Sequence, residues 1–96
     1  MNTISNTPQA ALEKIEECRK NKNDDLYLNN LDLIEIPKEI ADLTWLKRLH
    51  IINNQIQKIE GLDKLVNLGS LNLHNNQIQK IEGLRACLKI KIIKFG

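Results

Sequence analysis

A block of ten residues occurs twice in this chain of 96, and the repetition limits the fold more than any other feature. Residues 53–62, with the sequence NNQIQKIEGL, return unchanged as residues 75–84, which is 22 positions later. Aliphatic residues outside the block keep the same offset, so that Leu49 corresponds to Leu71. A fixed period of this length is typical of architectures in which each unit packs only against its neighbours.

The same correspondence divides most of the chain into units. Towards the N-terminus the offset becomes 23, because the segment 36–40 lies in a turn that is one residue longer than its equivalents. We therefore expect a repeat region over residues 24–96, preceded by a flexible N-terminus at residues 1–6 and a capping helix at residues 7–23. Within the repeat region the predicted units are 24–46, 47–68, 69–90 and a partial unit at 91–96.

Each unit opens with a pattern typical of a short strand. In residues 49–51 and 71–73 two aliphatic residues flank a polar one, so the aliphatic side chains face one side and the polar side chain faces the other. Asn54 and Asn76 follow where the chain must turn inward, and an inward amide can bond the backbone of the turn and of the neighbouring unit. Aliphatic residues spaced three apart over residues 56–68 then predict a loose or helical return segment.

This pattern, written LxxLxLxxNxIxxIxxL, resembles that of the leucine-rich repeat family from about Asp25 to Gly96. The 22-residue units are similar to repeats of phosphatase-regulatory and cytoskeletal proteins, and the 23-residue unit to repeats of bacterial and signalling proteins. The resemblance implies an α/β fold, namely a right-handed solenoid with short parallel β-strands on its concave face and an N-terminal capping helix. One departure is Leu31, which takes the asparagine position of the first unit beside Asn30.

The two ends of the stack differ in the sequence. Thr7 is expected as the N-cap and Pro8 as the first residue of a helix whose apolar face covers the first unit through Ala11, Leu12, Ile15 and Cys18. At the other end, residues 88–96 predict a strand that begins a fourth unit without a cap. An uncovered aliphatic edge strand leaves self-association open, and it favours the interpretation that the chain is a fragment or remnant of a longer repeat protein.

The sequence contains no residue set that predicts catalysis or metal binding. His50 and His74 are expected to project from the concave sheet, but no third ligand accompanies them. Cys18 and Cys87 match no metal-binding spacing and are expected as reduced, buried thiols. No phosphate-binding, nucleophile-elbow or zinc-protease motif is found, and we therefore predict a non-enzymatic protein without a cofactor.

Charge and hydropathy restrict the partner. Fourteen basic residues against twelve acidic ones, with three aromatic residues, provide neither the basic excess nor the stacking groups that nucleic-acid binding requires. Lys58 and Lys80 recur beside Glu60 and Glu82, which predicts a charge-balanced edge. No apolar run approaches the roughly 18 residues of a transmembrane helix, and residues 1–10 lack the pattern of a signal peptide. We expect no nucleic-acid or membrane partner, and a cytoplasmic location.

The resemblance implies that a protein partner binds the concave sheet. Residues that face outward before, within and after the strands form three columns, which are Asp25, Arg48, Ser70 and Ile92; Tyr27, His50, Asn72 and Lys94; and Asn29, Ile52, His74 and Gly96. The predicted binding residues are Tyr27, Asn29, Arg48, His50, Ile52, Ser70, Asn72 and His74. Aromatic and arginine side chains are enriched at the energetic centres of interfaces, and Ile52 is expected as an exposed aliphatic residue. Trp45 is expected to pack against the convex side of the N-terminal unit.

These observations predict a protein-interaction module that binds weakly by itself, because four short strands form a narrow surface. Two alternatives stay open. The segment from Ala11 to Ile40 is similar to the start of the bacterial repeat-GTPase family, so the chain would be the N-terminal recognition segment of a larger protein with an enzyme downstream. In the other alternative the chain is a truncated gene remnant without a partner.

Overall fold

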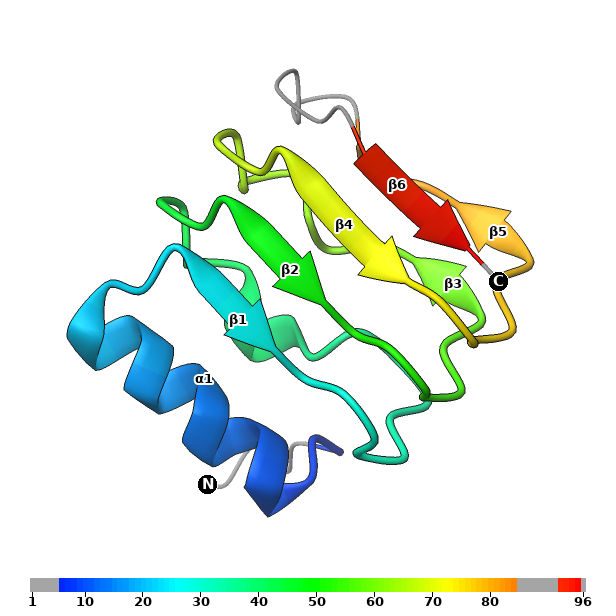
Figure 1. Ribbon diagram of the computed structural model, residues 1–96, viewed down its shortest axis with the longest axis horizontal. Coiled ribbons are helices and arrows are strands. Elements are labelled where there is room, and N and C mark those ends of the chain that lie inside the picture. Colours follow the sequence, from blue (N-terminus) through cyan, green and yellow to red (C-terminus); the bar gives the residue numbers. More distant parts are fainter. Residues whose placement is uncertain (1–5, 85–91, 96) are drawn as a thin grey trace, which may run out of the picture.

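Four parallel strands form one face of the molecule, and between successive strands the chain returns behind the sheet (Figure 1). The computed structural model describes residues 6–84 and 92–95. The strands are β1 (Asp25–Tyr27), β2 (Arg48–His50), β4 (Ser70–Leu73) and β6 (Ile92–Phe95), and they lie side by side in that order. The predicted solenoid, with one short parallel strand for each unit, is confirmed.

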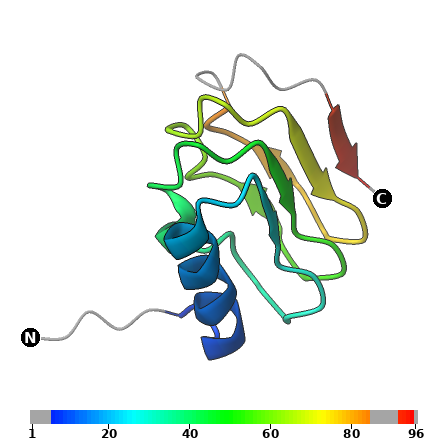
Figure 2. The ribbon, with the colours of Figure 1, turned by 60° about the vertical axis from the view of Figure 1, so that its left-hand side comes forward.

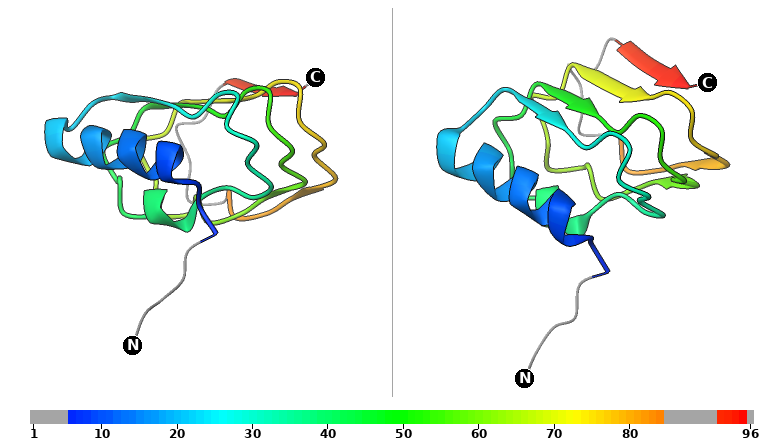
Figure 3. Two further views of the ribbon diagram at one scale, coloured as in Figure 1. Left: turned by 90° about the horizontal axis from the view of Figure 1, so that it is seen from below. Right: turned by 60° about the horizontal axis from the view of Figure 1, so that its bottom comes forward.

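Helix α1 (Gln9–Asn21) covers the N-terminal end of the stack, and this position is visible in Figures 2 and 3. Ala11, Ile15 and Cys18 are at most 1% exposed, so they form the side of α1 that packs on the first unit. Leu12, which the sequence placed on the same face, is only partly buried. The capping helix is therefore present, with a narrower apolar face than the sequence predicted.

The start of α1 differs from the prediction. Pro8 occupies the N-cap position instead of Thr7, and its carbonyl oxygen accepts hydrogen bonds from the first turn of the helix. The hydroxyl of Thr7 donates to Glu39 Oε1 at 2.7 Å, and Glu39 lies in the short 3₁₀ helix η1 (Lys38–Ile40). A long-range partner thus replaces the local cap, and it ties the entry of α1 to the return segment of the first unit.

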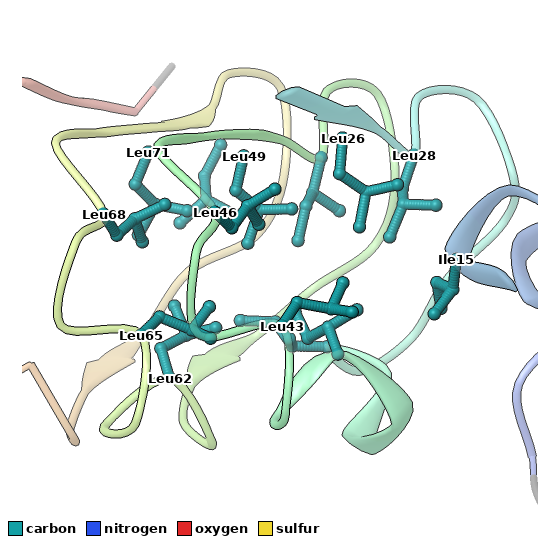
Figure 4. Packing of buried hydrophobic residues seen from close by; sticks show 14 of the residues in the cluster. Ile15, Leu26, Leu28, Leu43, Leu46, Leu49, Leu62, Leu65, Leu68 and Leu71 are labelled. Atoms are coloured by element: carbon teal, nitrogen blue, oxygen red, sulfur yellow. The ribbon is translucent and has the colours of Figure 1, made fainter. Parts of the chain in front are cut away.

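Two rows of aliphatic side chains, one from the strand side and one from the return side, form the core (Figure 4). Leu49 and Leu71 occupy equivalent positions in the strand row and are fully buried, as are Leu43 and Leu65 in the return row. The core is therefore a ladder in which each unit contributes the same aliphatic positions. Cys18 is buried and free, as predicted, whereas Cys87 lies outside the described residues.

The return segments of the second and third units contain strands that the sequence did not predict. β3 (Lys58–Ile59) and β5 (Lys80–Ile81) pair in parallel, and Glu82 N donates to the carbonyl oxygen of Ile59 at 2.9 Å. Outside these two-residue strands, the described return segments of both units are irregular, as the expectation of a loose or helical segment allowed, and the helical form occurs as η1 in the first unit. Two identical extended segments, one unit apart, can form this ladder because their backbone groups come into register.

Left-handed backbone conformations recur at one position of each unit. Asn30, Asn53 and Asn75 all have a φ of 59°, a conformation that asparagine adopts more readily than most residues. The sequence drew attention to the asparagine that follows in the second and third units, not to this one. The left-handed residue reverses the chain at the end of the strand, and the next side chain then points into the molecule.

That next residue is Asn54 in the second unit, and its amide satisfies four backbone groups. Asn54 is 7% exposed, and its Oδ1 accepts hydrogen bonds from the N–H groups of Leu31 and Leu33, both at 3.0 Å. Its Nδ2 donates to the carbonyl oxygens of Leu28 and Ile52. Three of these groups belong to the preceding unit, so Asn54 joins two units. One of them is the N–H of Leu31, the residue at the asparagine position of the first unit.

Asn76 repeats the arrangement one unit later. Its Oδ1 accepts from the N–H of Ile56 at 3.0 Å, and its Nδ2 donates to the carbonyl oxygens of Ile51 and Leu73. The side chain is only partly buried, unlike that of Asn54. Both asparagines therefore bond the unit before them and the turn that carries them.

The last described return segment is exposed on the side away from β3. Ile59 is fully buried, whereas Ile81, the same residue of the same ten-residue block, is 54% exposed. The difference arises because residues 75–84 cover the first block, as the pairing of β3 with β5 shows. Within the described part of the chain, no helix has the length and apolar character needed to cross a membrane.

Replacement of Asn54 by alanine is expected to lower the free energy of unfolding by about 2–4 kcal/mol, because buried backbone groups lose their partners. Urea unfolding followed by circular dichroism measures the change. Gln55→Ala is the matched control, since Gln55 is an exposed amide with no side-chain hydrogen bond in the described region, and about 0.5 kcal/mol or less is expected. Equal losses in both variants would contradict a stabilising role for the inward amide.

Ile59→Ala and Ile81→Ala compare one substitution in two copies of one sequence. Ile59→Ala removes fully buried methyl and methylene groups and should cost about 2–4 kcal/mol, whereas Ile81→Ala should cost less than about 1 kcal/mol. The same unfolding measurement applies. Similar costs would show that Ile81 is covered in solution.

Candidate binding face

The outward positions of β1, β2 and β4 form the concave face. In β1 and β2 the central residue is buried and its neighbours are exposed or half-buried, and in β4 Leu71 and Leu73 are buried whereas Ser70 and Asn72 are half-buried. The pairing register confirms two predicted columns, which are Asp25, Arg48, Ser70 and Ile92, and then Tyr27, His50, Asn72 and Lys94. For Ile92 and Lys94 the structure describes the backbone register alone.

An aromatic pair lies at the N-terminal side of this face. Tyr27 and His50 are partners in the register, and their rings stack with centroids 4.4 Å apart and planes 7° from parallel. Tyr27 is 53% exposed and therefore presents one ring face or edge to solvent, while His50 is half-buried. The stack presents aromatic surface of the kind that contributes strongly to protein interfaces.

A charged pair adjoins the aromatic pair. Arg48 donates two hydrogen bonds to the carboxylate of Asp25, one of them from Nη2 to Oδ2 at 3.1 Å and the other from Nε to Oδ1. Hydrogen bonding to Asp25 raises the pKa of Arg48. The two-point contact holds the guanidinium in one orientation beside the strand.

His50 has a buried ring nitrogen. Its Nε2 has no hydrogen-bond partner in the described structure, and it lies 4.0 Å from Asp25 Oδ1. Burial lowers the pKa of His50, the nearby carboxylate of Asp25 opposes this change, and the charge of Arg48 adds to it. The neutral imidazole is therefore the favoured form near neutral pH.

The third predicted column lies where the strands end. Asn29 Oδ1 accepts from the N–H of Ile52 at 2.8 Å, and Asn72 Oδ1 of the second column accepts from the N–H of His74 at 3.0 Å. Ile52 is half-buried, so its prediction as an exposed aliphatic residue is wrong. The backbone N–H of Ile52 donates to Asn29 Oδ1, and its carbonyl oxygen accepts from the N–H of Asn30. The first unit therefore lies against Ile52. His74 is exposed.

Trp45 lies outside the concave face. Its Nε1 donates to the carbonyl oxygen of Asn23 at 3.0 Å, and Lys22 Nζ lies 4.1 Å from the ring centroid. The prediction placed Trp45 against the convex side of the N-terminal unit, whereas the structure places it against the turn between α1 and β1. Trp45 therefore connects the end of the first unit to the end of the capping helix.

The recurring lysines are paired on the return side. Lys58 Nζ lies 3.4 Å from Glu60 and 3.3 Å from Glu82, and Lys80 Nζ lies 3.2 Å from Glu82. The predicted charge-balanced edge is confirmed. Among the described residues, no group of three or more histidine, cysteine or acidic side chains could hold a metal ion.

Comparisons with known proteins agree with this fold. Residues 44–86 match the family model described as "Leucine Rich repeats (2 copies)", a segment that includes nearly all of the second and third units. Among solved structures, the LRR domain of a Shigella effector is similar, with a TM-score of 0.68 and 23% identity, covering 85% of this chain and 36% of that chain. This chain therefore spans about a third of the length of that domain. A sequence search of curated proteins finds no match.

The free energy of unfolding is expected to fall as the pH decreases from about 7.5 to about 5.5. The pKa of His50 is lower in the folded state, so over this range the unfolded chain binds more protons, and acid favours it. Urea unfolding at a series of pH values measures the slope. His50→Phe keeps a ring beside Tyr27 and should reduce the slope. An unchanged slope in His50→Phe would contradict this assignment.

Proposed function

Because the repeated units of this chain are leucine-rich repeats, we propose that it is a non-enzymatic protein-interaction module whose partner binds the concave face. The observation that carries the proposal is the cluster of Tyr27, His50 and Arg48 on adjacent strands. Aromatic and arginine side chains dominate binding energy at protein interfaces. Here they are held in place before a partner arrives, which lowers the entropy cost of binding.

The surroundings of the cluster favour a partner with polar groups at its rim. The same face also carries the polar residues Ser70, Asn72, Asn29 and His74, and the side-chain oxygens of Asn29 and Asn72 accept hydrogen bonds from backbone N–H groups. The amide nitrogens of these asparagines are then available as donors. An apolar or aromatic residue of the partner would pack on Tyr27, with carbonyl or carboxylate oxygens around it.

The size of the face sets the expected strength. Four strands spaced by about 4.8 Å give a strip about 15 Å wide, and its area, on the order of a few hundred Å², is below the roughly 1,000 Å² expected of a stable interface. We therefore propose a weak, transient interaction. A cytoplasmic location is part of the proposal, and the free thiol of Cys18 supports it, since free buried thiols are common in reducing compartments.

A second proposal is that the chain is the recognition segment of a longer repeat protein, including one with a downstream enzyme such as a GTPase. Its support is the comparison in which this chain spans 36% of an LRR domain. The interaction chemistry of the concave face is the same in both proposals. The remaining alternative, a gene remnant without a stable fold, would show no cooperative thermal unfolding.

Photo-crosslinking tests the face. A benzophenone group at position 70 of the concave face should capture the partner, whereas the same group at position 64, on the return side, should not. With the captured protein purified, Tyr27→Ala and Arg48→Ala are expected to weaken binding by about tenfold or more. Ile34→Ala changes an aliphatic residue that is 65% exposed elsewhere and should bind as the unmodified chain does. Binding unaffected by the two concave-face variants would overturn the proposal.

A further inference from the structure

A hollow of about 150 Å³ lies between α1 and β1, at the edge of the concave face. β1 is the first strand of the sheet, and α1 lies alongside it (Figure 1). The capping helix and the first unit therefore form the hollow together. Residues of α1, of β1 and of the turn between them line it, including Lys14, Glu17, Cys18, Asn23, Asp25 and Tyr27.

One face of the Tyr27 ring borders this hollow. His50 of β2 stacks on the ring, with centroids 4.4 Å apart and planes 7° from parallel. Because β2 lies on one side of β1 and α1 on the other, the opposite face of the ring is directed toward α1. Tyr27 is 53% exposed and lines the hollow. A planar group that entered the hollow would therefore become the third layer of the existing stack.

The charges around the hollow favour a cation. Glu17 of α1 and Asp25 of β1 bring a carboxylate to the lining from each side. Asp25 pairs with Arg48, whereas Glu17 is exposed and forms no ion pair with any residue in the described ranges. The lining also includes the last turn of α1, where the helix dipole has its negative end. The negative face of an aromatic ring attracts cations as well.

Lys14 is the basic residue among those that line the hollow. Its side chain is exposed, and a lysine stem of this length allows the ammonium to reach solvent. No ammonium lies over the Tyr27 ring in the described structure, where the cation–π contact is the one between Lys22 and Trp45. The outer face of Tyr27 is therefore open to a cation from another molecule.

We propose that the hollow binds a guanidinium group, which is supplied by an arginine side chain of the protein that docks on the concave face. The planar guanidinium would stack on the outer face of Tyr27, and its N–H groups would donate to the carboxylates of Glu17 and Asp25. This inference rests on the proposed function, because the arginine belongs to the same partner. The apolar residue of the partner would contact the edge of the Tyr27 ring, and the arginine would lie on the side of α1.

Other groups match the hollow less well. A carboxylate or a phosphate would be repelled by the charges of Glu17 and Asp25. A lysine ammonium would meet the same carboxylates but has no planar surface to stack on the ring. A neutral aromatic ring would stack on Tyr27 and leave the carboxylate of Glu17 without a partner. A guanidinium satisfies the ring and the carboxylates together.

Nuclear magnetic resonance titrations of the full chain test the site without the partner. The probe is N-acetyl-arginine amide, and the control is N-acetyl-citrulline amide, which has nearly the same shape but no charge. Saturable shifts of the Tyr27 and His50 ring signals are expected with the arginine probe, at a Kd lower by about fivefold or more than that of the citrulline probe. N-acetyl-lysine amide should also bind less tightly than the arginine probe. Equal binding of arginine and citrulline, or no saturable shift, would overturn the proposal.

A charge substitution on α1 tests the predicted contact. Glu17→Gln should weaken binding of the arginine probe severalfold. Glu13→Gln is the matched control, since Glu13 is an exposed glutamate of the same helix that does not line the hollow, and it should leave binding unchanged. Thermal unfolding of both variants verifies that they fold. Unchanged binding in a folded Glu17→Gln chain would contradict the assignment of the hollow.

The partner captured through the concave face separates this inference from the proposed function. Glu17→Gln should weaken binding of that partner severalfold, and Glu13→Gln should not. If Tyr27→Ala and Arg48→Ala weaken binding but Glu17→Gln does not, the concave face binds the partner without an arginine in the hollow, and this inference alone fails. If the arginine probe binds as expected but the captured partner is insensitive to Arg48→Ala and Tyr27→Ala, the proposed function fails and the guanidinium site remains.

Discussion

The structure depends on how its turns satisfy buried backbone groups. Each strand ends in a reversal that takes the chain into the interior, where unpaired N–H and carbonyl groups are costly. Asn54 and Asn76 solve this problem by bonding the backbone of the preceding unit as well as their own turn. The reversals lead the chain from the strand row to the return row, and the buried aliphatic residues of both rows belong to one core cluster.

Stacking also makes burial a property of position in the array. Ile59 and Ile81 have the same neighbours in sequence over ten residues, but one is fully buried and the other is 54% exposed. The difference comes from the segment that lies on the other side of each strand. Stability in such a chain is therefore approximately a sum of contributions from the units and from the contacts between neighbouring units.

Part of the candidate binding face could be predicted from the sequence. The period placed Tyr27 beside His50 and Asp25 beside Arg48, because a parallel register follows directly from the repeat offset. The sequence could not predict the ring stacking of Tyr27 and His50, the buried Nε2 of His50 or the two hydrogen bonds from Arg48 to Asp25. These depend on side-chain conformations, which neighbouring strands decide together. The half-buried state of Ile52 was missed because it depends on the path of the adjoining first unit.

By itself the sequence determined the period, the strand positions, the inward asparagines and the aliphatic rows, because these follow from residue types at fixed intervals. Tertiary structure decided the features that depend on contacts between units. It paired β3 with β5, gave Thr7 a distant partner in Glu39 and placed Trp45 against the turn after α1. The physical reason is that residue types at fixed intervals specify the local structure of each unit, whereas burial and hydrogen bonding depend on the segments that lie beside that unit.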